Sequence, residues 1–426
     1  MNQILLGCIA DDFTGATDLA NNLVRSGMRV MQTIGVPDHP IAADVDAVVV
    51  ALKSRTVAPA DAITQSLLAL KWLQTQGAKQ IYFKYCSTFD STVQGNIGPV
   101  TEALMDALGT DFTVATPAFP DNGRTVFKGY LFVGNVLLNE SGMQNHPLTP
   151  MHDANLVRVM QAQTRRKVGL LGYSQVTQGA REIRAQMANL QAEGVGVAIV
   201  DALSNADLMR LGVALKGMPL VTAGSGVAIG LPQNFGIEPS AASSALPQAE
   251  GLRALVSGSC SLATNAQVAD FIQRGHPAWA LDPLQVAADA QAGKDLAAAA
   301  LTWAAPLLAS GPVLVYSTAS PEVVKAVQGR MGVEQAGALM ELALSRIARG
   351  LVDLGVRQLV VAGGETSGAC VQALAITQMQ IGPQIDPGVP WCFAASEAAP
   401  AGLHLTLKSG NFGTQDFFTK AFKLLR

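Results

Sequence analysis

A cluster of acidic and hydroxyl residues follows the first strand pattern of the chain. The pattern covers residues 4–10 and runs into the segment Ala10-Asp11-Asp12-Phe13-Thr14-Gly15-Ala16. Ligands of open α/β sheets bind at the carboxyl ends of strands, and a helix N-terminus there offers unpaired N–H donors. Asp11, Asp12 and Thr14 could therefore bind and deprotonate a polar substrate. Asp and Thr are also favoured N-caps, so a purely structural role is equally compatible with the sequence.

A second polar segment follows another strand pattern, at residues 81–85. It reads Lys84-Tyr85-Cys86-Ser87-Thr88-Phe89-Asp90-Ser91-Thr92 and combines one cation, one carboxylate and several hydroxyls. That set suits a polyhydroxylated acid, with Lys84 for its carboxylate and with Asp90 and Ser91 for its hydroxyls. Two further cations occupy comparable places, although each alone could be a surface residue: Arg55 and Arg124.

A glycine-rich segment, Thr222-Ala223-Gly224-Ser225-Gly226-Val227-Ala228-Ile229-Gly230, resembles a dinucleotide fingerprint. Its spacing is G-x-G-x-x-x-G, and no acidic residue follows at the end of a next strand, as the fingerprint requires. We therefore interpret it as a close approach of the backbone to a helix or ligand, with Ser225 as a candidate substrate contact. A nicotinamide-dependent oxidoreductase remains the alternative that this segment supports.

Three small-residue loops follow strand patterns in the second half of the chain. They are Val256-Ser257-Gly258-Ser259-Cys260-Ser261, Ala362-Gly363-Gly364-Glu365-Thr366-Ser367-Gly368 and Lys408-Ser409-Gly410-Asn411-Phe412-Gly413. Such loops let phosphates approach backbone N–H groups at helix starts. The Walker sequence G-x-x-x-x-G-K-[ST] is absent. Each loop alone could be a simple turn, but the three together favour nucleotide binding; a non-catalytic sugar-acid sensor would leave them unexplained.

The elements that must position these residues alternate between short apolar strands and helices. This alternation predicts an α/β fold of two domains, with largely parallel sheets covered by helices. A stretch rich in Pro, Ser, Ala and Gly predicts a linker at 232–250, between domains 1–231 and 251–426, with the active site in the cleft between the domains. A hairpin is expected over 124–133 and a final helix over 416–425. Further strands are expected at 47–52, 112–115, 168–171, 195–200, 220–223, 255–256, 279–281, 313–316, 359–361, 391–394 and 403–407.

The composition limits the classes of partner. The 426 residues contain 29 Lys and Arg against 32 Asp and Glu, a net charge of -3 that argues against nucleic-acid or membrane binding. Charged residues make up only 14%, so we expect surface buried between domains or subunits, compatible with a homodimer. The five cysteines form no C-x-x-C, which disfavours a thiolate zinc site. No signal peptide is evident, so a soluble cytoplasmic protein is expected.

Five of these motifs, in this order, resemble the four-carbon acid sugar kinase family over essentially the whole chain. They are the segment around Asp11 and Asp12, Pro117-Ala118-Phe119-Pro120 with Gly123-Arg124-Thr125, and the three C-terminal loops. The resemblance implies a sugar-acid domain, then a nucleotide domain, and ATP-dependent phosphorylation of the C4 hydroxyl of a four-carbon sugar acid. The motifs are most similar to those of members acting on 3-oxo-tetronate; members acting on D-threonate or D-erythronate are close relatives. The nucleotide contacts that it implies are Ser257, Ser259, Gly363, Gly364, Glu365, Thr366 and Gly410.

A phosphoryl transfer suggests a role for each charged group. Our hypothesis makes Asp12 the base for the C4 hydroxyl, with Asp11 or Asp90 as substitutes. Three cations would share the binding of the substrate carboxylate and the stabilisation of the transferred phosphoryl group: Lys84, Arg55 and Arg124. Mg²⁺ should bridge the phosphates of ATP, through Glu365 or water, and its protein ligands are left unassigned. Closure of the two domains about a hinge would limit wasteful hydrolysis.

Overall fold

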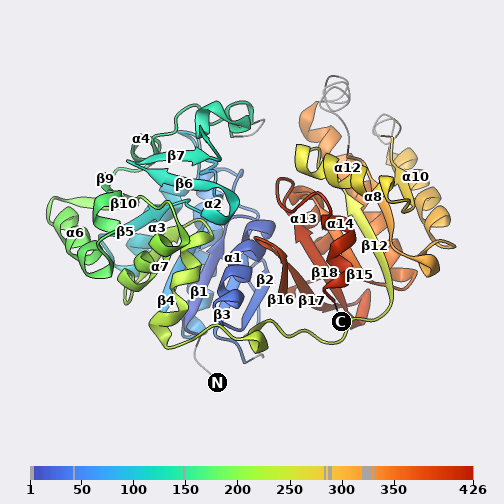
Figure 1. Ribbon diagram of the computed structural model, residues 1–426, viewed down its shortest axis with the longest axis horizontal. Coiled ribbons are helices and arrows are strands. Elements are labelled where there is room, and N and C mark those ends of the chain that lie inside the picture. Colours follow the sequence, from blue (N-terminus) through green and yellow to red (C-terminus); the bar gives the residue numbers. More distant parts are fainter. Residues whose placement is uncertain are drawn as a thin grey trace. The chain divides into compact units, whose positions relative to one another are not determined.

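The computed structural model describes residues 4–41, 44–146, 149–282, 285, 290–318, 329 and 332–425. The chain divides into two compact units, Met1–Ser244 and Ala245–Arg426. In Figure 1 the first unit is coloured from blue to green and the second from yellow to red. Each unit has a mostly parallel sheet with helices on its faces, so the α/β fold class is confirmed. The domain limits 1–231 and 251–426 remain predictions.

The sheet of the first unit is built from strands that follow one another in the order β2-β3-β1-β4-β11-β5-β10-β9. Neighbouring strands pair in parallel, and β1, β3 and β4 are buried along their whole length. Both faces of such strands must be apolar, which is why they read as continuous Val-, Ile- and Ala-rich runs. Their bounds are β1 Leu6–Ala10, β2 Val30–Ile34, β3 Ala47–Ala51, β4 Gln80–Lys84, β5 Thr113–Thr116, β9 Lys167–Leu171, β10 Val195–Val200 and β11 Leu220–Ala223.

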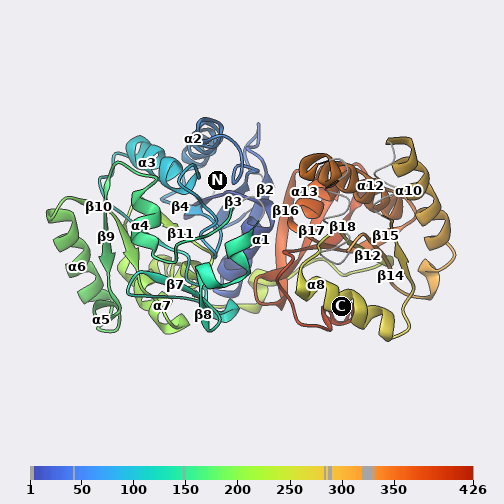
Figure 2. The same ribbon diagram turned by 90° about the horizontal axis from the view of Figure 1, so that it is seen from above.

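Helices cover both faces of this sheet. Figure 2 shows α2 (Pro59–Thr75) and α3 (Ile97–Leu108) on one face, and α1 (Phe13–Arg25) and α7 (Asn205–Ala214) on the other. The strands that follow β1 in the sequence, β2 and β3, lie on one side of it, whereas the next strand, β4, lies on its other side. The strand order therefore reverses at β1. The crevice at such a reversal is where open α/β sheets bind ligands. Shorter helices complete the unit: α4 Leu156–Gln161, α5 Tyr173–Val176 and α6 Ala180–Ala192.

Outside this sheet, the first unit carries a small antiparallel sheet and a series of tight turns. The predicted hairpin is confirmed: β6 (Arg124–Phe127) pairs with β7 (Tyr130–Val133), and β8 (Val136–Leu137) extends it. The predicted linker contains ordered 3-10 turns. One of them is held to α1, where the hydroxyl of the buried Ser243 donates a hydrogen bond to the Val24 carbonyl at 2.9 Å. The 3-10 turns are Pro120–Asn122, Leu138–Glu140, Gly142–Asn145, Gly226–Gly230, Pro232–Phe235 and Ala241–Ser244.

The sheet of the second unit has the order β13-β14-β12-β15-β18-β17-β16. Its first five strands are parallel, whereas β18, β17 and β16 form an antiparallel meander. Figure 2 shows α10, α12 and α13 on one face and α8 on the other. The strands are β12 Leu252–Ser257, β13 Ala278–Ala280, β14 Val313–Tyr316, β15 Val356–Ala362, β16 Gln378–Asp386, β17 Val389–Ser396 and β18 Ala399–Lys408. The helices are α8 Leu262–Gln273, α10 Ala290–Ala304, α12 Val333–Asp353, α13 Gly364–Ala373 and α14 Phe417–Lys420, with 3-10 turns Leu308–Ser310 and Ala421–Lys423.

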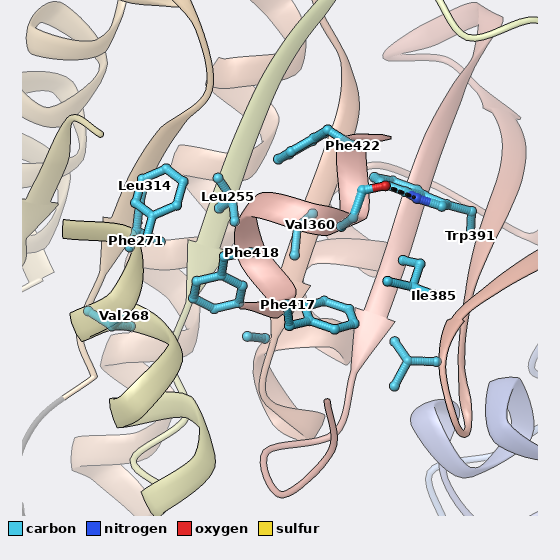
Figure 3. Close-up of a cluster of buried hydrophobic side chains, with 13 residues drawn as sticks. Leu255, Val268, Phe271, Leu314, Val360, Ile385, Trp391, Phe417, Phe418 and Phe422 are labelled. Carbon is cyan, nitrogen blue, oxygen red and sulfur yellow. Dashed lines mark hydrogen bonds between the residues drawn. The ribbon is translucent and has the colours of Figure 1, made fainter. Parts of the chain in front are cut away.

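The C-terminal segment closes the core of the second unit. Phe417 and Phe418 of α14 pack among buried side chains of β12, β14, β15 and α8, as Figure 3 shows. The predicted helix over 416–425 is therefore wrong in its extent: α14 ends at Lys420, and a 3-10 turn follows. The Ala421 carbonyl accepts a hydrogen bond from Trp391 Nε1 at 2.9 Å, which draws this turn onto β17. Among the described residues, no helix is long and apolar enough to cross a membrane.

Candidate active site

The junction of β1 and α1 carries both acidic residues of the first motif. Asp12 is the N-cap of α1, and its Oδ1 accepts the Gly15 backbone N–H at 2.7 Å. The Thr14 hydroxyl donates to Asp12 Oδ2 at 3.3 Å. The capping interpretation of Asp12 is therefore confirmed. Although burial opposes it, the cations Arg55 and Lys84 lower the pKa of Asp12.

Arg55 binds both acidic residues from the loop after β3. Its Nε and Nη2 donate to the two carboxylate oxygens of Asp11 at 2.9 and 2.8 Å, and Nη2 also lies 3.0 Å from Asp12 Oδ1. Asn96 fixes the loop, because its Nδ2 lies 2.7 Å from the Ser54 carbonyl and 3.1 Å from the Arg55 carbonyl. The sequence analysis did not single out Asn96, whose role depends on a contact 41 residues away.

Lys84 brings a second cation into the same cluster. It ends β4 beside Ala10 of β1, and only 2% of it is exposed. A Cβ built on Gly15 would lie 2.6 Å from Lys84 Nζ and 2.2 Å from Asp12 Oδ1. A side chain at this position would require Asp12 or Lys84 to move, so the charged groups pack closely around Gly15. The structure thus brings Asp11, Asp12, Thr14, Arg55 and Lys84 together, as their places after neighbouring strands predict.

The loop after β4 holds the next group of predicted site residues. Asp90 Oδ1 accepts a hydrogen bond from the Thr88 hydroxyl at 2.5 Å. The Ser91 hydroxyl is buried, donates to Gln163 Oε1 at 3.0 Å and accepts the Ile97 N–H at 3.4 Å, so it is engaged in holding α3. Phe89 is buried in the left-handed region with φ 52°, a strained conformation typical of loops that serve a site. The substrate roles of Asp90 and Ser91 remain predictions.

A further group of polar side chains has buried atoms without partners. Arg124 Nη1 donates to the Asn122 carbonyl, but Arg124 Nε has no hydrogen-bond partner among the described residues. The same holds for Ser225 Oγ and for Oδ1 of Asp18 on α1. Arg124 and Asp18 lie close enough to influence each other's pKa. Sequence reasoning missed Asp18, although it lies four residues after Thr14 and hence on the same side of the helix.

The glycines around Ser225 serve close packing. A Cβ on Gly226 would lie 2.3 Å from the Ala118 carbonyl oxygen, and a Cβ on Gly230 would lie 2.7 Å from the Leu208 carbonyl oxygen. The predicted close approach of the backbone is confirmed, with α7 and the loop after β5 as the approaching parts. This packing accounts for the glycine spacing without a dinucleotide.

The three glycine loops of the second unit meet at the carboxyl ends of β12, β15 and β18. Gly258 N donates to the Ala362 carbonyl at 3.0 Å, and Gly363 N donates to the Lys408 carbonyl at 2.8 Å. A Cβ on Gly258 would lie 2.2 Å from Thr366 Oγ1, and a Cβ on Gly410 would lie 2.5 Å from Ser259 Oγ. The predicted contact residues of these loops therefore lie together. The other predicted contact residues flank the place where the loops meet. Ser257 Oγ lies 2.7 Å from Thr318 Oγ1. Gly364 and Glu365 are exposed in the first turn of α13.

Lys408 holds the last of these loops in shape. Its Nζ donates to the carbonyls of Ser409, Gly410 and Phe412 at 3.0, 3.1 and 3.2 Å, and to Thr264 Oγ1 at 2.9 Å. The side chain is fully buried, and burial lowers the pKa of Lys408 to about 7. The carbonyl acceptors act in the opposite direction, because hydrogen bonds to them favour the charged form of Lys408 and so raise its pKa. Sequence analysis placed Lys408 in the motif without giving it this role.

The described residues contain no group of three or more His, Cys, Asp or Glu side chains that could hold a metal ion. A divalent cation that accompanies a nucleotide does not need such a group, because Mg²⁺ is bound through phosphates, water and one or two carboxylates. The glycine loops are compatible with that mode of binding, because Glu365 in the first turn of α13 offers one carboxylate beside them.

Comparisons with known proteins cover both units. A family model described as a sugar-binding N-terminal domain matches residues 6–231, and one described as a nucleotide-binding C-terminal domain matches residues 254–418. A Pseudomonas fluorescens protein named 3-oxo-tetronate kinase is 58% identical over 98% of this chain and 96% of its own length. A Burkholderia multivorans protein of the same name is 58% identical over 99% and 97%.

A solved structure from Salmonella typhimurium LT2, whose description refers to a tRNA synthase, has a TM-score of 0.88 at 44% identity. The match covers 99% of each chain. The fold, the order of the two family models and the relatives agree with the family that the motifs indicated. The chain belongs to the four-carbon acid sugar kinase family.

Proposed function

We propose that this protein is a kinase that transfers the terminal phosphoryl group of ATP to the C4 hydroxyl of 3-oxo-tetronate. The observation that carries this proposal is the 58% identity to proteins named 3-oxo-tetronate kinase, over nearly the full length of both chains. That span includes the charged cluster of the first unit and the glycine loops of the second. Neither of these two relatives is named for D-threonate or D-erythronate.

The charged cluster supplies the groups that a four-carbon sugar acid requires. The buried Lys84 and Arg124, whose Nε has no hydrogen-bond partner among the described residues, are the cations suited to the substrate carboxylate and the transferred phosphoryl group. Arg55 is already engaged with Asp11 and Asp12, so we assign it to shaping the acidic pair. Asp11 and Lys84 are buried, which strengthens their charge interactions.

The glycine loops supply the nucleotide side of the reaction. Backbone N–H groups at the starts of α8 and α13 are suited to phosphate oxygens, because they need no side-chain charge and approach closely at glycine. Mg²⁺, as the usual companion of ATP, would be held by phosphates, water and Glu365, and it would neutralise charge on the phosphates. Transfer requires the terminal phosphorus of ATP to come within bonding reach of the C4 hydroxyl of the sugar acid.

Three other functions are less well supported. The close packing at Gly226 and Gly230 accounts for the segment that suggested a nicotinamide cofactor. A tRNA substrate, which the description of the Salmonella relative suggests, does not fit a chain with 29 basic against 32 acidic residues. A sensor that binds sugar acids without catalysis leaves the glycine loops without a role.

The test is ADP release by the purified protein with Mg·ATP and each of 3-oxo-tetronate, D-threonate and D-erythronate. We expect release with 3-oxo-tetronate at a kcat/KM at least tenfold above the other two. Absorbance of reduced nicotinamide, followed in parallel with the same acids, should stay unchanged. ATP-independent binding of the acids without ADP release would favour the sensor instead.

A further inference from the structure

Asp18 is a buried carboxylate next to the charged cluster that none of the predicted roles includes. It lies on α1, three residues after Gly15 and four after Thr14, and therefore on the helix side that faces the cluster. Only 4% of it is exposed, and its Oδ1 has no hydrogen-bond partner among the residues described. A buried carboxylate oxygen without a donor destabilises the fold, so a role in function explains the presence of Asp18 better than a role in packing.

Charged and titratable groups surround Asp18 from each neighbouring element. Lys84 and Tyr82 belong to β4, Arg124 belongs to β6, and Asp12 caps the same helix. Ser225, after β11, lies close enough to lower the pKa of Asp18, although its hydroxyl makes no hydrogen bond of good geometry with a described residue. The cations favour the carboxylate, whereas burial, the largest influence, raises its pKa to about 6.

The other carboxylates of the cluster are occupied by donors. Arg55 binds both oxygens of Asp11, and Asp12 accepts from the Gly15 N–H, the Thr14 hydroxyl and Arg55. Asp90 accepts from the Thr88 hydroxyl. Donors that bind the charged form hold a carboxylate in that form and make it a weaker base. Asp18 alone among these four retains a buried oxygen with no donor from the described residues.

We propose that Asp18, rather than Asp12, is the general base for the substrate hydroxyl. The proposal rests on the kinase function proposed above. The C4 O–H bond breaks and its proton passes to the Asp18 carboxylate, while the C4 oxygen forms a bond to the terminal phosphorus of ATP. The bond from that phosphorus to the bridging oxygen breaks, and ADP leaves with the bonding electrons. Lys84 and Arg124 flank the transferred group, and Asp12 keeps its structural role as the N-cap.

The test compares Asp18→Asn with Asp12→Asn and with Asp153→Asn in single turnovers with 3-oxo-tetronate, so that product release does not mask the chemical step. Asp18→Asn should slow phosphoryl transfer about 10²- to 10⁴-fold and change the Kd of the sugar acid less than tenfold. Asp153→Asn makes the same chemical change at an ion pair with Arg158 outside the cluster and should keep the wild-type rate. An Asp18→Asn rate within threefold of wild type, with Asp12→Asn inactive, would overturn the assignment.

The pH dependence of the single-turnover rate, compared between wild type and Asp18→Asn, gives a second readout. The wild-type single-turnover rate should rise through about pH 6 and then level off, because Asp18 must be ionised to accept the proton. The terminal phosphate of ATP titrates in the same pH range. If Asp18→Asn keeps the rise in rate through about pH 6, that rise belongs to ATP and counts against the proposal. A flat wild-type profile between pH 5 and 8 would overturn it as well.

Failure of the kinase proposal is distinguishable from failure of the assignment to Asp18. If wild-type protein releases no ADP with any of the three acids, the kinase function falls, and the assignment falls with it. If the wild type is active and Asp18→Asn is equally active, only the base assignment falls. Circular dichroism and thermal melting of each variant show whether a lost rate reflects lost folding.

Discussion

The two candidate sites are built from different materials. In the first unit, Asp11, Asp12, Arg55 and Lys84 bring four charged side chains together around a single glycine, Gly15. In the second unit, backbone groups and hydroxyls form the site, and glycines bring the loops into contact. The buried Lys408 beside these loops donates hydrogen bonds to carbonyls of its own loop. The first site is thus suited to recognising chemical groups, and the second to receiving phosphates.

This difference has a physical reason. A sugar acid is distinguished from its relatives by where its carboxylate and hydroxyls lie, so the protein must offer charges and acceptors at fixed positions. Every nucleoside triphosphate carries the same phosphates, and backbone N–H groups bind them at no cost in side-chain ordering. Substitutions should therefore affect the first site through charge and geometry, and the second through the space between loops.

The largest expected effect comes from adding one methyl group in each site. In Gly15→Ala the new Cβ would meet Asp12 Oδ1 at 2.2 Å and Lys84 Nζ at 2.6 Å, so the charged groups must move. A displacement of about 1 Å costs about 10²-fold in rate, and we expect at least that loss in kcat/KM for the sugar acid. The Kd of ATP, measured by calorimetry, should stay within threefold of wild type.

The matched variant in the second unit is Gly258→Ala, whose Cβ would lie 2.2 Å from Thr366 Oγ1 and 2.8 Å from Leu344 Cδ1. It should raise the Kd of ATP about tenfold or more, as a misplaced loop loses phosphate contacts, and leave the Kd of the sugar acid unchanged. If each variant weakened both substrates equally, the division of labour between the two sites would be contradicted.

Arg55→Lys tests whether the geometry of the cation matters in the first site. The charge is kept, but a single ammonium cannot reproduce the forked contact with Asp11 and the further contact with Asp12. A lost charge-assisted hydrogen bond is worth about 1.5–3 kcal/mol, so kcat/KM for the sugar acid should fall about 10- to 100-fold. Arg158→Lys, which alters a surface fork with Asp153, serves as the control and should have no effect on kinetics.

Lys408→Met tests whether a buried cation in the second site acts on the loop rather than on a ligand. The substitution keeps an unbranched side chain one atom shorter than lysine and removes its hydrogen bonds to the carbonyls of the 409–412 segment. We expect a rise of about tenfold in the Kd of ATP, equivalent to one lost charged hydrogen bond, and an unchanged Kd for the sugar acid. Lys167→Met, which loses one exposed bond to the Glu193 carbonyl, is the control. Weakened sugar-acid binding would assign Lys408 a different role.

The sequence predicted most of the sheet because parallel strands buried on both faces read as apolar runs. It missed β16, where Gly382 and Pro383 interrupt a segment that also contains three glutamines and one aspartate. It also missed β2, a half-buried strand of five residues. Strands of this kind depend on their neighbours for stability, and their sequences resemble loops.

The candidate site was predictable to the extent that its residues follow strands. Asp11, Arg55 and Lys84 each do so, and neighbouring strands bring their carboxyl ends together. Asp18 lies inside a helix, where a polar residue normally indicates a solvent-facing side. However, all residues of α1 from Phe13 through Val24 are buried. This burial depends on other parts of the fold that pack against both sides of the helix, so the helix sequence alone does not show it. The helix also contains Thr14, Thr17, Asn21 and Asn22, so its sequence carries no signal that singles out Asp18.

The smallest expected effect concerns stability, and it follows from the cost of placing Asp18 in the first site. Its pKa is raised from 3.8 to about 6 in the folded protein, so the folded state binds more protons than the unfolded state between about pH 4 and 6. Stability contributed by the neutral form is therefore lost as pH rises through this window. Two pKa units correspond to about 3 kcal/mol, an upper bound.

Asp18→Asn removes this titration but introduces amide N–H groups that cost about 1–3 kcal/mol if unpaired, leaving a net gain of about 1 kcal/mol at pH 7. The melting temperature of the variant should exceed that of wild type by about 2–4 °C at pH 7, and the difference should shrink toward pH 4. Asp153→Asn should show a small effect of opposite sign, because Arg158 lowers the pKa of Asp153 and stabilises its charged form. A pH-independent difference for Asp18→Asn would mean that its carboxylate is ionised throughout, and hence too weak a base for the role proposed here.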